Sequence, residues 1–118
     1  MRVRQAARAS AVAANLSLVD QTKFVTAASE IARNALIHGG GGRATLEVVE
    51  NGRRSGVRAV FADDGPGIAD IDLALTDGWS SGSGLGLGLS GTRRLVDSFE
   101  IDSVPGRGTT VTVTKWGR

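Results

Sequence analysis

Residues 24–38 read FVTAASEIARNALIH, and this stretch decides the fold that we expect. At about 100° per residue, Phe24, Ala28 and Ile31 fall on one apolar stripe of a helix. The helix should run from about residue 18 to residue 37, and more than half of its circumference is apolar. We therefore expect a central helix that other elements largely cover.

The segments on either side of this helix carry boundary signals. Residues 3–14 are rich in alanine and lack glycine and proline, so a first helix is expected there. Ser17, with Asp20 three residues on, resembles a capping box with Asp in the place of the usual Glu or Gln. The glycine run at residues 39–42 ends the long helix.

The rest of the chain alternates between strand and helix patterns. Residues 44–48 and 57–61 have apolar side chains at every second position, as strands do, and residues 51–56 between them favour a hairpin connection. The remaining expected elements are a short helix near residues 70–75, a glycine-rich loop over 78–88, a helix from about 89 to 98, and a final hairpin of residues 100–104 and 109–115. This order predicts an α+β fold, a two-layer α/β sandwich whose mixed, mostly antiparallel sheet carries helices on one face. We expect a single domain over residues 1–118.

The composition excludes several classes of function. Fourteen Lys and Arg against twelve Asp and Glu leave a net charge of +2, too small for a nucleic-acid footprint. The absence of cysteine excludes a disulfide scaffold, a thiolate zinc site and a cysteine nucleophile, and a single histidine argues against a transition-metal cluster. No uncharged apolar run approaches the roughly 20 residues that span a bilayer, and no signal-peptide core follows the basic start. We expect a soluble, cytoplasmic protein with no nucleic-acid or membrane partner.

Glu30, Asn34 and His38 form one row along the long helix, beside the apolar stripe. A Glu at the edge of a core can accept a proton, and the carbonyl oxygen of an Asn is a hard ligand that suits Mg²⁺. The same row also fits a solvated helix edge, and His38 alone fits a helix-end residue that contacts exposed carbonyls.

The segment Asp63-Asp64-Gly65-Pro66-Gly67 follows an apolar strand. An acid at the end of such a strand can point into the interior, where a partly covered carboxylate needs donors. An exocyclic amine with a neighbouring ring nitrogen would suit it. Two glycines around a proline are also typical of an ordinary tight turn.

Residues 82–89 read GSGLGLGL and lead directly into a helix. Backbone without Cβ atoms lets N–H groups approach phosphate oxygens, and a helix N-terminus favours negative charge. A glycine run alone is weak support for this chemistry. No Gly-Lys-Ser/Thr follows it and no buried strand precedes it, which argues against a P-loop and against a dinucleotide-binding unit.

The last strand offers one polar side chain on its inner side. Val111 and Val113 should face inward, and Thr109 shares their side. The Thr109 hydroxyl could reach Asp63 directly or through water. A threonine chosen only for its strand propensity fits the position equally well.

The order of these motifs resembles that of the GHKL (Bergerat-fold) ATPase superfamily, which includes gyrase B, Hsp90, MutL and the histidine kinases. Within it, the chain looks most like the small bacterial protein-serine kinases that act as stressosome switches. The stretches that carry the resemblance are residues 29–34 (SEIARN), 63–68 (DDGPGI), 77–81 (DGWSS), 84–89 (GLGLGL) and 115–116 (KW). Family members usually begin with a strand before the first helix, whereas this chain starts almost inside that helix, so we expect either a truncated chain or a sheet that has lost this edge strand.

The resemblance implies ATP and Mg²⁺ as cofactors. Asp63 would hold the adenine amino group with Thr109 in support, or Thr110 if the strand register slips. Gly67 would let the chain pass close to the base, and Gly65 belongs to the same turn. At the phosphates, the resemblance implies a lid made by residues Gly84, Leu85, Gly86, Leu87 and Gly88.

The remaining implied roles belong to the row of Glu30, Asn34 and His38 along the long helix, called the helix row below. Asn34 would bind the Mg²⁺ that bridges the phosphates, Glu30 would be the general base, and His38 would lie near the phosphates. The implied activity is an ATP-dependent protein serine/threonine kinase that phosphorylates a STAS-domain protein in a partner-switching module of the stress response. A sigma factor or a downstream phosphatase would be a further partner.

Two alternatives stay open. Residues 34–39 also resemble the anti-sigma factors of the same superfamily, so a protein that sequesters a sigma factor and phosphorylates an anti-anti-sigma protein is the first alternative. The second is a nucleotide-binding interaction module with negligible turnover. Glu30 argues against the second, because binding alone has no use for a base.

Overall fold

The computed structural model describes residues 2–39, 42–65 and 88–117. The elements are α1 (Arg2–Ala13), α2 (Leu18–Gly39), β1 (Arg43–Asn51), β2 (Arg54–Asp63), α4 (Gly88–Arg93), β3 (Ser98–Val104) and β4 (Gly108–Trp116). The helix predicted near residues 70–75 and the glycine loop up to residue 87 lie outside the described residues.

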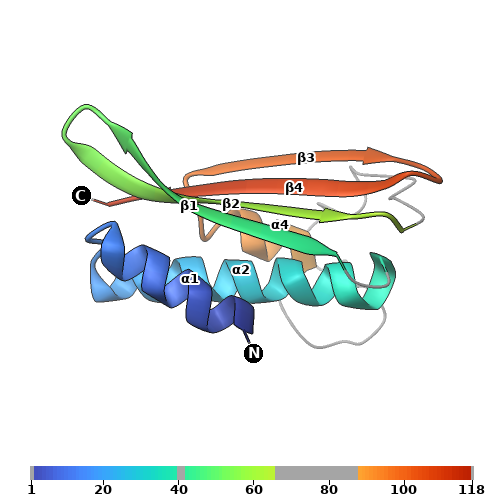
Figure 1. Ribbon diagram of the computed structural model, residues 1–118, viewed down its shortest axis with the longest axis horizontal. Helices are drawn as coiled ribbons and strands as arrows, with labels where there is room; N and C mark the ends of the chain where they lie inside the picture. The colour runs from blue at the N-terminus through green and yellow to red at the C-terminus, as the bar shows by residue number, and fades with distance from the viewer. Residues whose placement is uncertain (1, 40–41, 66–87, 118) are drawn as a thin grey trace.

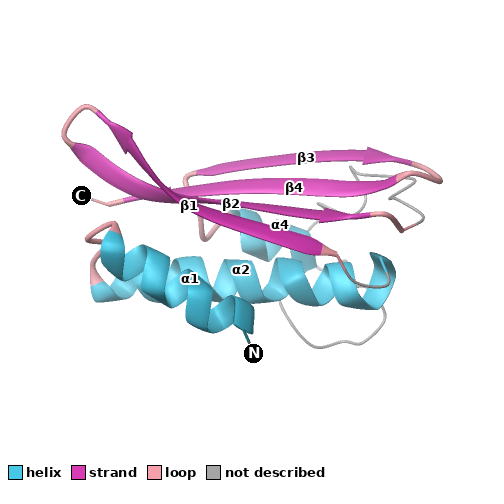
Figure 2. Ribbon diagram, in the orientation of Figure 1, coloured by secondary structure: helices cyan, strands magenta, loops and turns pink. Residues whose placement is uncertain are grey.

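The strands form one sheet in the order β1-β2-β4-β3, and each neighbouring pair is antiparallel. Figures 1 and 2 show α1, α2 and α4 on one face of this sheet. The predicted α+β architecture, two layers with helices on one face of a mostly antiparallel sheet, is therefore confirmed.

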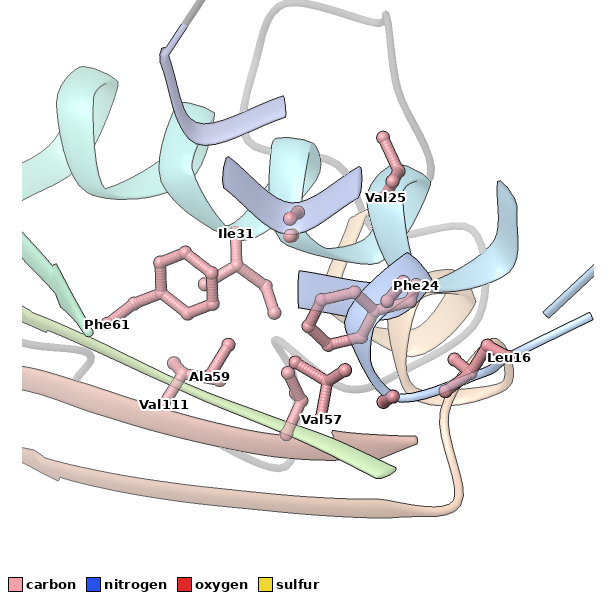
Figure 3. Packing of buried hydrophobic residues seen from close by; sticks show 13 residues of the cluster. Leu16, Phe24, Val25, Ile31, Val57, Ala59, Phe61 and Val111 are labelled. Carbon is pink, nitrogen blue, oxygen red and sulfur yellow. The ribbon is translucent and has the colours of Figure 1, made fainter. Parts of the chain in front are cut away.

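The core lies between α2 and the helix-facing side of the two central strands. In β2, Val57, Ala59 and Phe61 alternate toward the helices and are buried. Phe24 and Ile31 of α2 point toward these strand residues in Figure 3, as the predicted apolar stripe requires. Each large side chain of this kind contributes about 1.5–3 kcal/mol on burial, so the long helix is held to the sheet by its stripe.

The first helix packs with small side chains. Ala7, Ala11 and Ala14, at or next to α1, are fully or almost fully buried in the same core as Val25 of α2. Because alanine projects little beyond the backbone, α1 can lie close to both α2 and the edge strand β1, which it contacts.

The predicted cap of α2 is present in part. The Asp20 N–H donates to Ser17 Oγ at 3.1 Å, which is the first half of a capping box. The Asp20 carboxylate is directed elsewhere, since its Oδ1 lies 3.6 Å from Lys115 Nζ of β4. The first turn of the central helix is thus tied to the last strand by a buried ion pair.

Two predicted boundaries are wrong. The helix expected over residues 89–98 ends at Arg93, because Asp97 joins the sheet edge: its N–H donates to Thr114 O at 2.9 Å, and its Oδ2 accepts the Trp116 N–H at 2.7 Å. The hairpin connection expected over residues 51–56 is only two residues long, since Asn51 pairs with Arg54. Gly52 has φ +63°, the left-handed conformation that short hairpin turns need.

Candidate active site

Three polar residues form one row across the end of the sheet. Asp63 is the last residue of β2 and pairs with Thr109 of β4, which in turn pairs with Ser103 of β3. Directly paired residues point to the same face, and Asp63 has the parity of the buried Phe61. The row therefore continues the helix-facing core with a carboxylate and two hydroxyls.

Local contacts hold each member of the row in place. The Gly65 N–H donates to Asp63 Oδ1 at 2.9 Å, which limits the rotation of the carboxylate. Ser103 Oγ and Thr109 Oγ1 lie 2.9 Å apart, and Ser103 Oγ donates to the Gly108 carbonyl at 3.2 Å. A carboxylate offers about four acceptor positions, so the bond to Gly65 leaves capacity for a ligand that donates.

The register of β4 places Thr109, and not Thr110, beside Asp63. Thr109 is 9% exposed and lies on the same side as Val111 and Val113. Thr110 pairs with Ala62 and is exposed on the opposite face of the sheet. Of the two threonines, Thr109 is therefore the one that shares the helix-facing side with Asp63, and its role at a bound base stays a prediction.

Two glycines, Gly42 and Gly108, lie in close contact with the backbone at the end of β2. A Cβ at Gly108, where φ is +113°, would clash with the Asp63 carbonyl oxygen and lie 3.0 Å from Asp64 Cα. A Cβ at Gly42 would clash with the Ala62 carbonyl oxygen and lie 3.2 Å from Asp63 Cβ. At both positions the backbone approaches the end of β2 more closely than a residue with a Cβ atom would allow.

The helix row lies on α2. Glu30 and Asn34 are half-buried on successive turns, and Glu30 Oε2 lies 3.9 Å from Arg33 Nη1. The Glu30 side chain is only 19% exposed, which places it at the edge of the core and not in open solvent. His38 belongs to the last turn of α2, and its side chain lies outside the described part of the chain, as do Gly67 and residues 84–87.

Figure 1 shows which elements meet at the end of the molecule where β2 ends. The C-terminal part of α2, the end of β2, the end of β3 and the start of β4 all lie at that end. Of the predicted site residues, the structure brings Asp63, Gly65 and Thr109 together on the sheet and keeps Glu30 and Asn34 together on the helix. Gly88 is the first residue of α4, which packs against α2.

Sequence reasoning missed three residues of this end of the sheet: Ser103, Gly42 and the structural role of Gly108. Counting back through the final hairpin from Thr109 would have found Ser103, because a three-residue turn at residues 105–107 sets the two opposite each other. Gly42 gave no such signal, since it is one of four consecutive glycines.

The described residues fit the chemistry of a bound purine triphosphate and Mg²⁺. The partly buried row of Asp63, Thr109 and Ser103 offers acceptors to an amine, and Asn34 offers a hard amide oxygen of the kind that Mg²⁺ accepts beside phosphate oxygens and water. In the described part of the chain, no three His, Cys, Asp or Glu side chains gather as a metal site of their own. No helix within the same residues combines the length and apolar character needed to cross a membrane.

Residues 19–116 match the family of histidine kinase-, DNA gyrase B- and HSP90-like ATPases, and the chain belongs to this family. Membership confirms the predicted superfamily and implies ATP binding. The chain is similar to the serine/threonine-protein kinase RsbT of Bacillus subtilis (strain 168), with 41% identity over 115 residues that cover 98% of this chain and 86% of the relative.

More distant similarity links the chain to two anti-sigma F factors. They come from Thermoanaerobacter sp. (strain X514) and Thermoanaerobacter pseudethanolicus (strain ATCC 33223 / 39E). Each is 31% identical over 97 residues, which cover 77% of this chain and 66% of the relative.

Proposed function

We propose that this chain is an ATP-dependent protein serine/threonine kinase of the GHKL type, and that it phosphorylates a STAS-domain protein in a bacterial partner-switching module of the stress response. The observation that carries the proposal is the 41% identity to a serine/threonine-protein kinase over 98% of the chain. The similarity extends over the segments that carry Glu30, Asn34, Asp63 and Thr109, since it covers 98% of the chain.

In this proposal, the end of the sheet binds the base of ATP. Asp63 accepts a hydrogen bond from the adenine amino group, and Thr109 supports it from the neighbouring strand. What supports this assignment is the partly covered carboxylate, whose Oδ1 is held by the Gly65 N–H at 2.9 Å and whose remaining acceptor capacity faces the same side as the core.

Glu30 is the proposed general base. An acceptor hydroxyl is barely ionised at neutral pH, so its proton must leave as the oxygen bonds to the γ-phosphorus and ADP departs. A carboxylate that is 19% exposed at the edge of the core can take that proton, and the Arg33 guanidinium 3.9 Å away limits its rotation.

Asn34 is the proposed protein ligand of Mg²⁺, through its amide oxygen. It lies one turn after Glu30 on the same helix, so the metal and the base would act on the same phosphate tail. When bound, Mg²⁺ would supply positive charge that offsets the negative charge developing on the phosphates. His38 and the loop at residues 84–88 are proposed to lie near the phosphates by resemblance alone.

The decisive experiment follows transfer of the γ-phosphate. The full chain is incubated with γ-labelled ATP, Mg²⁺ and purified candidate STAS-domain proteins, and label on Ser or Thr is quantified. Glu30→Gln should lower the transfer rate by about 10²–10⁴-fold while the ATP dissociation constant stays within about twofold. Glu50→Gln, an exposed glutamate on β1, is the matched control and should transfer at the wild-type rate.

Two results would contradict the proposal: no labelled protein with any STAS-domain candidate, or undiminished transfer by Glu30→Gln. A second candidate function is an anti-sigma factor that binds a sigma factor directly, which the similarity to two anti-sigma F factors favours. Stable co-elution of the chain with a sigma factor, without STAS phosphorylation, would support that function instead.

A further inference from the structure

The side of α2 that carries Glu30 continues toward the start of the helix, and the function proposed above gives no role to that part. At about 100° per residue, three residues lie within about 40° of Glu30 around the helix axis and are called the N-terminal row below: Val19, Lys23 and Thr26. Because an α-helix rises about 1.5 Å per residue, Lys23 lies about 10 Å and Val19 about 16 Å from Glu30 along the axis. Since α2 runs along the long axis of the molecule, the N-terminal row leads away from the candidate site (Figure 1).

The N-terminal row is accessible from solvent. Val19 is 64% exposed, Lys23 is exposed and Thr26 is half-buried. In the described part of the chain, no Asp or Glu side chain pairs with Lys23. An apolar side chain and an unpaired cation therefore lie exposed on the same side of α2 as the proposed base.

The charges of the two long helices favour an acidic partner. Residues 2–39 contain two acidic side chains, Asp20 and Glu30. Asp20 is buried and paired with Lys115, and the Glu30 side chain is only 19% exposed. Neither of them offsets the positive charge that Lys23 presents at the surface, so a complementary surface carries a carboxylate.

From this placement we infer that the N-terminal row docks the protein substrate of the kinase. The docked surface of the substrate carries an acidic side chain opposite Lys23 and an apolar side chain opposite Val19. This inference rests on the proposed function, because it takes Glu30 as the base that receives the proton of the acceptor hydroxyl. The acidic side chain and the acceptor hydroxyl are then about 10 Å apart on the substrate, a separation that one folded domain can provide.

Reversal of the charge at Lys23 should weaken docking without changing the chemistry. In Lys23→Glu an attraction becomes a repulsion, so KM for the protein substrate should rise by about threefold to tenfold, whereas kcat and KM for ATP should stay within about twofold. Because salt screens exposed charges, added salt should raise KM for the protein substrate in the wild type and lower it in Lys23→Glu. A residue that only stabilised α2 would not reverse the sign of the salt effect.

Two matched pairs of variants test the position of the surface. Val19→Asp should raise KM for the protein substrate, because it removes an apolar contact and adds a negative charge. Leu18→Asp is its control, since Leu18 is 73% exposed in the same turn but lies about 120° from Glu30 around the helix axis. Arg53→Glu, in the exposed turn between β1 and β2, is the control for Lys23→Glu with the same change of charge. Both controls should keep the wild-type KM.

The experiment measures transfer from γ-labelled ATP by the full chain to the STAS-domain protein that the wild type labels most strongly. The concentration of each substrate is varied in turn, and urea denaturation checks that each variant is folded. If Lys23→Glu is destabilised, Lys23→Gln, which only removes the charge, replaces it. Changing one exposed Asp or Glu of the STAS-domain protein to Lys should restore the wild-type KM of Lys23→Glu, which identifies the paired residue.

The outcomes distinguish this inference from the proposed function. If the wild type labels no STAS-domain protein, both are overturned. If it labels one, but KM for that protein is unchanged in Lys23→Glu or in Val19→Asp, docking at the N-terminal row is overturned and the kinase function stands. The same holds if these variants lower kcat with KM unchanged, or if they lose only the binding of a sigma factor, because the row then serves another purpose.

Discussion

The helix-facing side of β4 carries a polar residue near each end. The two differ in their partners: one is paired with charged side chains and the other with a neutral hydroxyl. Near the Trp116 end, Lys115 Nζ lies 3.6 Å from Asp20 Oδ1 and 3.7 Å from Asp97 Oδ1, and the Lys115 side chain is only 7% exposed. At the Gly108 end, Thr109 contacts the neutral Ser103 and lies beside Asp63. Among the residues that the structure describes, no cationic side chain pairs with Asp63.

This difference separates a structural polar cluster from the candidate binding site. Lys115 is paired with the buried Asp20 and with Asp97, whose side chain is 39% exposed, so the lysine has little capacity left for a ligand. Asp63 and Thr109 keep the capacity to accept hydrogen bonds, and they lie next to the apolar helix-facing residues of β2 and β4. A ligand can supply the donors there. Burial alone does not distinguish the two ends, since Lys115 and Thr109 are both buried.

The largest effect on stability is expected at the Trp116 end of β4, where Lys115 is paired with two carboxylates. Lys115→Met removes the cation and leaves Asp20, which is 5% exposed, as a buried charge without its partner. We expect the free energy of unfolding to fall by about 3–5 kcal/mol, measured by urea denaturation. Arg58→Met is the control: it breaks the exposed pair with Glu47 at 3.3 Å and should cost less than about 1 kcal/mol. Equal losses in the two variants would mean that the buried cluster is not held by its charges.

The next largest effect is expected at Gly108, whose backbone lies against the Asp63 carbonyl group. Gly108→Ala combines a strained φ of +113° with a clash against the Asp63 carbonyl oxygen, so unfolding free energy should fall by roughly 2–3 kcal/mol and ATP affinity should also drop. Gly106→Ala shares the positive φ, at +83°, but its Cβ would meet no heavy atom within 4 Å. It should cost about 1–2 kcal/mol and leave ATP affinity intact. Matching ATP affinities for the two variants would show that the contact at Asp63 does not shape the site.

The third prediction concerns Asp63, at the end of the sheet where no charged side chain of the described residues pairs with it. Asp63→Asn keeps an acceptor for the Gly65 N–H but loses the charge, and a hydrogen bond to a charged group is stronger than one to a neutral group. ATP affinity by calorimetry should fall by about 10–100-fold, while the urea midpoint changes little. Asp64→Asn is the matched control, since that side chain is 82% exposed, and it should bind ATP like the wild type. Unchanged affinity in Asp63→Asn would place the base elsewhere.

The smallest effect is expected on the helix side of the site. Mg²⁺ takes most of its ligands from phosphates and water, so Asn34 supplies one oxygen among several. Asn34→Ala should remove most of the severalfold tightening of ATP binding by Mg²⁺, measured as the ratio of dissociation constants with and without the metal. Asn51→Ala, at the exposed last residue of β1, should leave that ratio unchanged. A ratio that persists in Asn34→Ala would move the metal to other ligands.

Local pattern was enough to predict most of the architecture. The apolar stripe of α2, the Ser17 cap and the alternation in β2 and β4 each depend on near neighbours in the sequence, and each is present in the structure. The predicted helix over residues 89–98 failed because Asp97 bonds to Thr114 and Trp116, two residues that no helical pattern can anticipate.

The candidate site also has features that local sequence predicts and features that depend on tertiary structure. The residue types and the order of Glu30, Asn34, Asp63 and Thr109 follow from the sequence alone, and their roles remain predictions. The choice of Thr109 over Thr110, and the presence of Ser103 in the row, depend on the register of three strands. A shift of one residue would turn every side chain of β4 to the other face.

The sequence by itself therefore determined which helices and strands form, where the central helix is apolar, and which side chains could carry phosphate-transfer chemistry. Only the tertiary structure decided that Lys115 pairs with Asp20 and Asp97, and that the Ser103 and Thr109 hydroxyls lie 2.9 Å apart. The physical reason is range: propensity and periodicity act over a few residues, whereas ion pairs and hydroxyl orientations depend on atoms that only strand pairing and helix packing bring within about 4 Å of each other.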